Sequence, residues 1–226
     1  MEESTRFEIT NTHLANWHLR LRIPDGEGPH PVILMLHGWT GDENAMWIFN
    51  SRLPKDALLI APRGLYGTPL GGYGWHTYQN GVWPIVEDFR PSVNALIELL
   101  TPEYFMNLDI DISRFSSTHI VGFSQGAALA FSLALMHPER VISIAGLSGF
   151  LPEGSSSFII HEPLIGKKVF LAHGTTDKLV PVERARNEVD LLRTAGAEVT
   201  YCEDDVGHKL SASCFRGMES FFAINL

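Results

Sequence analysis

The chain has 226 residues, of which 45% are hydrophobic, and it carries a net charge of −9. This length and composition predict one domain, residues 1–226, with a large buried core. The acidic excess disfavours nucleic acid as a partner. There is no run of about 18 apolar residues and no basic, then apolar, signal-peptide pattern at the N-terminus, so we expect a cytoplasmic protein without integral membrane association.

The residues that commonly form disulfides or bind metals are few or scattered. Cys202 and Cys214 are the only cysteines, too few for a disulfide framework and without the CxxC spacing of a zinc site. We interpret both as structural. The ten histidines include no HExxH or HxH pair. The sequence therefore predicts no metal and no other cofactor.

The first predicted elements are the two strands of an antiparallel hairpin. Apolar and polar residues alternate over 6–10 and 17–23, as expected for a sheet with one solvated face, and Pro24 begins a turn. Continuous apolar runs follow, which are typical of strands buried on both faces of a mainly parallel sheet. These runs lie at 32–36, 57–61, 119–123, 141–145, 169–172 and 198–202.

Helical segments alternate with these strands, most clearly at 86–100, 127–136, 183–194 and 211–222. The alternation predicts the α/β class, with a doubly wound, mainly parallel sheet. Two long loops, at 63–84 and 150–166, interrupt the rhythm, and such loops often line sites. Neither is long enough for a separate cap domain. We expect an open site with the first loop forming one wall.

The central motif is the GxSxG pattern from Gly122 to Gly126, which lies between a predicted strand and a predicted helix. A sharp turn there strains Ser124 and brings backbones close together, which explains a glycine at both ends of the motif. The turn would expose the Ser124 hydroxyl as a nucleophile at a helix N-terminus. The alternative is that Ser124 merely caps a buried helix.

A nucleophilic serine needs a base and an orienting acid, and in this arrangement they follow in the order acid, then histidine. Asp177 follows the strand at 169–172, and His208 follows the strand at 198–202. We therefore predict Asp177 as the acid and His208 as the general base. Asp177 can also be an ordinary turn residue and His208 an exposed loop histidine, and Asp204 and Asp205 are alternative acids.

Two backbone N–H groups are predicted to form an oxyanion hole. The N–H of Gln125 lies at the start of the helix after Ser124, where the helix dipole favours negative charge. The second donor is Trp39, in the loop after the strand at 32–36. We interpret His37 as structural and expect His173 to pack beneath the site.

Aromatic and apolar residues near these loops predict a hydrophobic substrate pocket. Trp75, Met46, Phe150 and Val180 are the predicted substrate contacts. Each of the aromatic residues can also serve loop packing, and for Trp47 a place in the core is the better interpretation.

From about Val32 onward the chain resembles the phospholipase/carboxylesterase group of α/β hydrolases, which includes acyl-protein thioesterases and small bacterial carboxylesterases. The resemblance rests on Leu36-His37-Gly38, Ala61-Pro62-Arg63, Gly74-Trp75, Gly122-Phe123-Ser124-Gln125-Gly126, His173-Gly174-Thr175-Thr176-Asp177 with Val180-Pro181, and Gly207-His208. It implies the same triad and oxyanion donors, and a place for Trp75 near the substrate. The chain departs from the family at Trp39-Thr40-Gly41, commonly Leu-Gly, and at His76-Thr77, often Phe or Tyr then Asp, so substrate preference is not carried across.

The sequence thus predicts a serine carboxylesterase that hydrolyses small-molecule esters through an acyl-enzyme, as a monomer or homodimer. A thioesterase or lysophospholipase acting on long acyl chains is the alternative within the same fold. A slow-turnover ligand-binding protein on this fold is the alternative from another class. Pocket length separates the first two, and the intact triad argues against the third.

Overall fold

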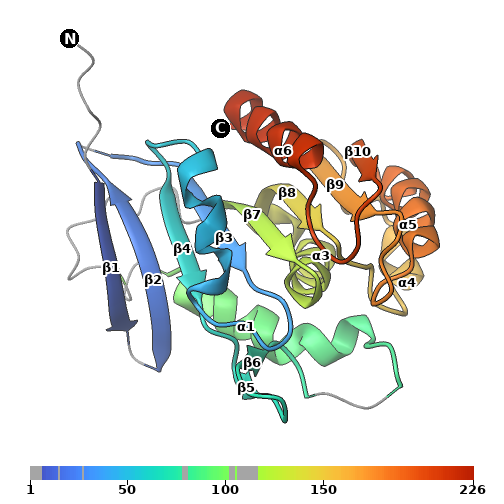
Figure 1. The fold of residues 1–226 in the computed structure, drawn as a ribbon, viewed down its shortest axis with the longest axis horizontal. Coiled ribbons are helices and arrows are strands. Elements are labelled where there is room, and N and C mark those ends of the chain that lie inside the picture. The colour runs from blue at the N-terminus through green and yellow to red at the C-terminus, as the bar shows by residue number, and fades with distance from the viewer. Residues whose placement is uncertain (1–6, 15, 27, 78–80, 102–104, 106–116) are drawn as a thin grey trace.

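The computed structural model describes residues 7–14, 16–26, 28–77, 81–101, 105 and 117–226. An eight-stranded sheet crosses the molecule in the order β1-β2-β4-β3-β7-β8-β9-β10 (Figure 1). Its strands are β1 (Phe7–Leu14), β2 (Trp17–Pro24), β3 (Val32–Leu36), β4 (Leu58–Pro62), β7 (Thr118–Phe123), β8 (Val141–Leu147), β9 (Lys168–Gly174) and β10 (Glu198–Asp204). All eight predicted strands are present, with ends shifted by a few residues.

The sheet is mainly parallel, as predicted. β1 pairs antiparallel with β2, and β2 antiparallel with β4. The other neighbours, from β4 through β10, pair in parallel. The carboxyl ends of β3, β7, β9 and β10 therefore meet at one edge of the sheet, where ligands bind in open α/β sheets.

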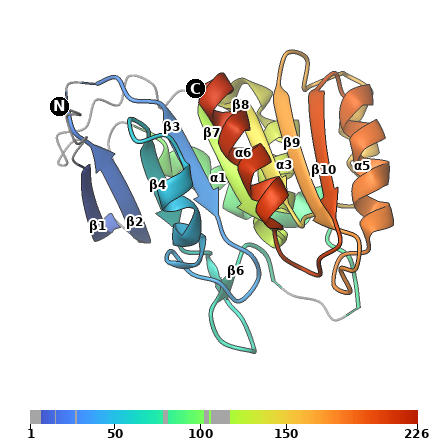
Figure 2. The same cartoon turned by 45° about the horizontal axis from the view of Figure 1, so that its top comes forward.

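Helices cover both faces of this sheet. One face carries η2 (Val86–Phe89), α1 (Arg90–Leu99), α3 (Gln125–Met136), α4 (Ser156–Ile159) and α5 (Val182–Thr194). The other carries η1 (Ala45–Arg52) and α6 (Ala212–Asn225), which lie in front of the strands in Figure 2 with α1 and α3 behind them. The short helix η4 (Pro138–Arg140) leads into β8.

The alternation of side chains along each strand divides the core into two layers. In β3, Leu34 and Leu36 belong to the cluster that includes the α3 residues, while Ile33 and Met35 belong to the cluster that includes Phe222 of α6. All of these strand residues are completely buried. Full burial of one such side chain contributes about 1.5–3 kcal/mol, so a buried apolar run is stable only where helices cover both faces.

The two stretches predicted as loops contain short elements that the sequence did not indicate. In the first, β5 (Tyr66–Gly67) and β6 (Tyr73–Gly74) form a small antiparallel hairpin, while residues 78–80 lie outside the described chain. The second contains α4. Over the described part of the chain neither stretch forms a separate cap. Among the described residues, no helix is long and apolar enough to cross a membrane.

Cys202 of β10 and Cys214 of α6 form a disulfide. The sequence predicts a structural role for both cysteines but not this bond. The twelve-residue separation closes a loop around the segment that carries His208.

Candidate active site

Ser124 lies at the sharp turn between β7 and α3. Its backbone φ is +54°, a value that residues with a side chain rarely adopt. A β-carbon on Gly122 would lie 2.5 Å from the Gly126 carbonyl oxygen, and one on Gly126 would lie 2.1 Å from the Leu36 carbonyl oxygen. Both positions therefore require glycine for the reason that the motif predicts.

Asp177 lies on the loop after β9, and its side chain is completely buried. Its Oδ1 accepts hydrogen bonds from the backbone N–H groups of Leu179 (2.8 Å) and Val180 (3.0 Å). These bonds hold the carboxylate in one orientation and leave Oδ2 to face His208. Asp177 therefore stabilises the turn and also contacts His208.

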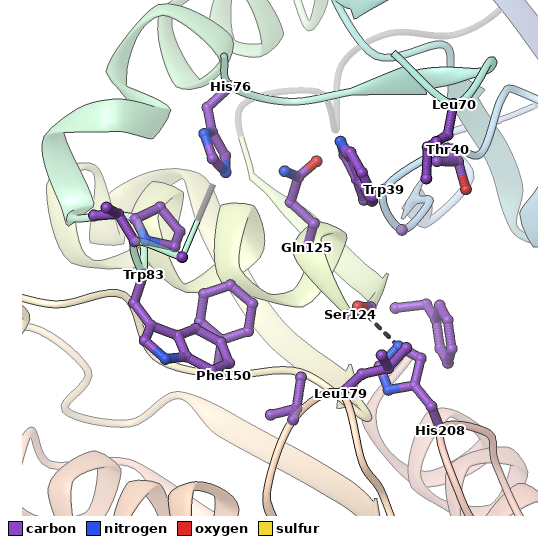
Figure 3. Close-up of a pocket in the computed structure, with 16 residues that line it drawn as sticks. Trp39, Thr40, Leu70, His76, Trp83, Ser124, Gln125, Phe150, Leu179 and His208 are labelled. Carbon is purple, nitrogen blue, oxygen red and sulfur yellow. Dashed lines mark hydrogen bonds between the residues drawn. The ribbon is translucent and has the colours of Figure 1, made fainter. Parts of the chain in front are cut away.

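His208 follows β10 and joins the other two side chains. Its Nδ1 lies 2.7 Å from Asp177 Oδ2, and its Nε2 lies 3.0 Å from Ser124 Oγ (Figure 3). Because a carboxylate only accepts, Nδ1 carries the proton and Nε2 is left to accept from the serine hydroxyl. The structure therefore brings Ser124, His208 and Asp177 into one hydrogen-bonded chain.

The alternative acids have other partners. Asp204 Oδ2 accepts from the Ser213 hydroxyl at 2.5 Å, and Asp205 Oδ1 accepts from Thr175 at 3.4 Å. The hydrogen bond from the Ser213 hydroxyl is the main reason that the pKa of Asp204 lies below its ordinary value. These contacts favour Asp177 over Asp204 and Asp205 as the partner of His208.

The predicted oxyanion donors both lie beside Ser124. Gln125 is the first residue of α3. The N–H groups of the first helical turn have no partner within the helix and point out of its N-terminal end, and the Gln125 N–H is one of them. Trp39 follows Gly38, at which a β-carbon would lie 3.3 Å from Ser124 Cβ. Both residues line the cavity that contains Ser124 and His208.

This cavity measures about 660 Å³ and is walled mainly by apolar side chains (Figure 3). Phe150 and Val180, two of the predicted substrate contacts, line it, and so do residues 81–84 of the first long loop. The other lining residues are Gly38, Trp39, Thr40, Leu70, His76, Phe123, Ser124, Gln125, Leu179 and His208. Leu70, Val82 and Leu179 also line the cavity but are not predicted from the sequence, because nothing in their local pattern separates them from ordinary exposed loop residues.

The prediction for Trp75 as a substrate contact requires correction. Trp75 is completely buried and does not line the cavity; its indole N–H donates to the His37 carbonyl, and its backbone N–H donates to Gln125 Oε1, both at 2.8 Å. It supports the cavity wall from behind. Met46 lines a second cavity, on the η1 side of Trp39.

His37 and His173 are buried structural residues. His37 Nε2 accepts from the Gly64 N–H at 2.8 Å, so Nδ1 carries the proton and donates to the Gly38 carbonyl at 2.7 Å. Burial also lowers the pKa of His37 and keeps the ring neutral. His173 lies 2.8 Å from the Val180 carbonyl oxygen and packs below Asp177, as expected.

A second serine–histidine contact joins Ser143 Oγ and His119 Nδ1 at 2.8 Å inside the sheet. Ser143 is 1% exposed and His119 is 4% exposed. Burial lowers the pKa of His119 to about 4. Because substrate has no access to this pair, we assign it to the core.

A serine at a strained strand-to-helix turn, joined to a histidine and a buried aspartate at the carboxyl edge of a mainly parallel sheet, defines an α/β hydrolase. The family model described as Phospholipase/Carboxylesterase matches residues 22–226. The chain therefore belongs to the phospholipase/carboxylesterase family.

Curated relatives carry two kinds of description. Acyl-protein thioesterase 1 of Mycosarcoma maydis is 36% identical over 88 residues (38% of this chain, 37% of the relative), and that of Debaryomyces hansenii is 28% identical over 185 residues (73% and 77%). A protein of Oryza sativa subsp. japonica described as a probable inactive carboxylesterase is 35% identical over 94 residues (40% and 38%). The chain spans less than half of the length of the rice and M. maydis relatives.

Solved structures share the fold. The carboxylesterase from Mesorhizobium loti superposes with a TM-score of 0.76 at 20% identity, covering 95% of this chain and 98% of that one. The Bacillus cereus carboxylesterase gives a TM-score of 0.72 at 20% identity, covering 100% and 96%. At this identity the likeness supports the fold alone.

Proposed function

We propose that this protein is a serine carboxylesterase that acts through an acyl-enzyme. The observation that carries the proposal is the hydrogen-bonded chain from Ser124 through His208 to Asp177, which opens into an apolar cavity. Neither a binding site nor a helix cap alone requires a strained serine aligned with a histidine and a buried acid.

The chemistry follows from the positions of the atoms. Ser124 Oγ attacks the ester carbonyl carbon while His208 Nε2 takes the hydroxyl proton. Negative charge develops on the carbonyl oxygen, which the N–H groups of Trp39 and Gln125 stabilise. When the tetrahedral intermediate collapses, the C–O bond to the alcohol breaks and the leaving oxygen takes the proton from Nε2.

Water then completes the cycle. His208 removes a proton from water, the hydroxide attacks the acyl carbon, and the carboxylic acid leaves as Ser124 Oγ recovers its proton. Asp177 keeps Nδ1 protonated and stabilises the imidazolium ion in both halves of the reaction. The mechanism uses no metal or other cofactor.

A thioesterase acting on long acyl chains is the second candidate, and the family relationship favours it, because two relatives are described as acyl-protein thioesterase 1. The same serine chemistry cleaves a thioester, so only substrate choice separates the two activities. A cavity of about 660 Å³ with apolar walls accommodates an acyl chain.

A non-catalytic role is the rival from another class, because one relative is described as a probable inactive carboxylesterase. The hydrogen bonds that join Ser124, His208 and Asp177 support catalytic turnover instead.

The test compares p-nitrophenyl esters from acetate to palmitate with the matching acyl thioesters. We expect ester hydrolysis by the wild type and a loss of about 10³-fold or more in Ser124→Ala, which removes the attacking oxygen and little packing. A fluorophosphonate should label wild type at Ser124 and leave Ser124→Ala unlabelled. A folded Ser124→Ala protein that keeps more than about a tenth of the activity would refute the assignment, and a preference for thioesters would favour the second candidate.

A further inference from the structure

A second cavity of about 360 Å³ lies next to the one that contains Ser124. It shares Gly38, Trp39, Thr40 and Phe123 with the first cavity, so the two meet at the loop that carries a predicted oxyanion donor. Beyond these residues it is lined by Gly41, Ala45, Met46, Ile48, Phe49, Lys209, Leu210 and Phe215. The mechanism above does not use it.

We propose that this second cavity binds the leaving group of the ester, and that this group is an apolar alcohol that contains an aromatic ring. The inference rests on the proposed esterase function and names the substrate class of that site. The first cavity then holds the acyl chain, so the ester lies across Ser124 with one arm in each cavity.

The position of His208 supports this assignment. The leaving oxygen must take its proton from His208 Nε2, so the alcohol has to lie on the histidine side of the serine. Ser124 and His208 themselves line the first cavity, and Lys209 and Leu210, which directly follow His208, line the second, so the second cavity begins next to the histidine. Phe123, whose ring centre lies 5.1 Å from that of His208, lines it as well.

One end of the first cavity extends in the opposite direction. Figure 3 places Trp83 and Phe150 on one side of Ser124, and Thr40 on the other. Thr40 belongs to the second cavity as well, whereas Trp83 and Phe150 line only the first. Leu70, which Figure 3 places beside Thr40, also lines only the first cavity, so the first cavity spans both sides of Ser124. Its end at Trp83 and Phe150 is the part that leads away from the second cavity, as two arms of one substrate require.

The lining chemistry indicates an aromatic group. Phe49 and Phe215 stack with ring centres 5.2 Å apart, and Met46 lines the same cavity. Met46 and Phe49 are each 3% exposed, while Ile48 is 71% exposed, so the cavity has a buried wall and an accessible rim. Aromatic rings and a thioether sulfur make favourable contacts with another ring. A volume near the lower end of the usual range for ligand pockets suits one ring rather than a long chain.

The experiment compares ethyl butyrate with 2-phenylethyl butyrate, which share the acyl group and differ only in the leaving group. Ile48→Trp fills the rim of the second cavity from an exposed position and should lower kcat/KM for the phenylethyl ester at least about tenfold relative to the ethyl ester. Val82→Trp, at a 62% exposed residue of the first cavity, should instead lower kcat/KM for ethyl decanoate relative to ethyl butyrate. Ile160→Trp, which is 74% exposed and lines neither cavity, should leave both ratios unchanged.

Hydrolysis of ethyl butyrate by the wild type tests the esterase function by itself, and the two ratios test the cavities. Binding adds a readout that needs no turnover. Ligand-observed NMR should show that 2-phenylethanol and octanoate bind Ser124→Ala at the same time. Adding Ile48→Trp to that variant should weaken the binding of 2-phenylethanol and leave the binding of octanoate unchanged. Equal effects of Ile48→Trp on both butyrates would overturn the proposal. So would competition between the alcohol and octanoate, or an Ile48→Trp effect confined to acyl-chain length.

Discussion

Gly174 and Val206 lie so close that a β-carbon on Gly174 would be 2.1 Å from the Val206 carbonyl oxygen. Two hydrogen bonds join the segment that follows β9 to the end of β10 and the segment after it, from the Thr175 N–H to the Asp204 carbonyl (2.9 Å) and from the Thr176 N–H to the Val206 carbonyl (3.1 Å). One loop carries Asp177 and the other carries His208. The close approach at Gly174 therefore sets the distance between the acid and the base.

Gly174→Ala should separate these loops and lower kcat by about tenfold or more, because a small displacement of the base disturbs both of its hydrogen bonds. Gly207→Ala is the matched control, since a β-carbon there has no atom within 4 Å. It should cause a much smaller loss. Steady-state kinetics with thermal unfolding checks both; equal kcat values in two folded variants would contradict the role of Gly174.

Asp177→Asn should lower kcat by about 10²–10⁴-fold with little change in KM, because the amide no longer holds His208 with Nδ1 protonated and touches no substrate. The matched variants are Asp204→Asn and Asp205→Asn, whose carboxylates contact Ser213 and Thr175 instead. Both should stay within a few-fold of wild type. A crippled Asp205→Asn beside an active Asp177→Asn would reassign the acid.

Glu188 predicts a dependence of stability on pH. Burial raises the pKa of this carboxyl from 4.5 to about 8, although a hydrogen bond from the Leu151 N–H and the charge of Arg184 oppose the shift. The folded chain therefore holds a proton that the unfolded chain releases above pH 4.5. The stabilisation is complete below that pH and is lost as the pH rises to about 8.

Glu188→Gln removes this titration, and its amide oxygen can still accept from Leu151. Urea unfolding should show that the free energy of unfolding of the wild type falls by on the order of a few kcal/mol from pH 5 to pH 8. That of the variant should fall by less. Glu198→Gln, at an exposed residue, is the control and should follow the wild type. Identical losses in wild type and Glu188→Gln would show that another group dominates.

The disulfide between Cys202 and Cys214 should stabilise the chain and fix the loop that carries His208. Cys202→Ser with Cys214→Ser should lower the free energy of unfolding by about 3 kcal/mol, because the unfolded chain gains the freedom of an open loop. Dithiothreitol should have a similar effect on the wild type and none on the double variant. An unfolding curve of wild type that does not respond to the reductant would exclude this role.

The positions of the buried strands and the predicted catalytic residues were readable from the sequence for a physical reason. Buried parallel strands appear as continuous apolar runs, and their carboxyl ends share one edge, so Ser124, Asp177 and His208 could be expected together from the strands that precede them. The glycines at 122 and 126 mark a local close approach, which the local pattern also reveals.

Tertiary structure decided what depends on contacts between distant segments. The pairing of Cys202 with Cys214 requires α6 to pack on β10, and the burial of Trp75 requires its indole to reach the His37 carbonyl across the sheet edge. The second cavity likewise forms where η1, the Trp39 loop and α6 meet. A local pattern shows whether a side chain is apolar, whereas the packing of remote elements determines whether that side chain faces the core, a partner or a substrate.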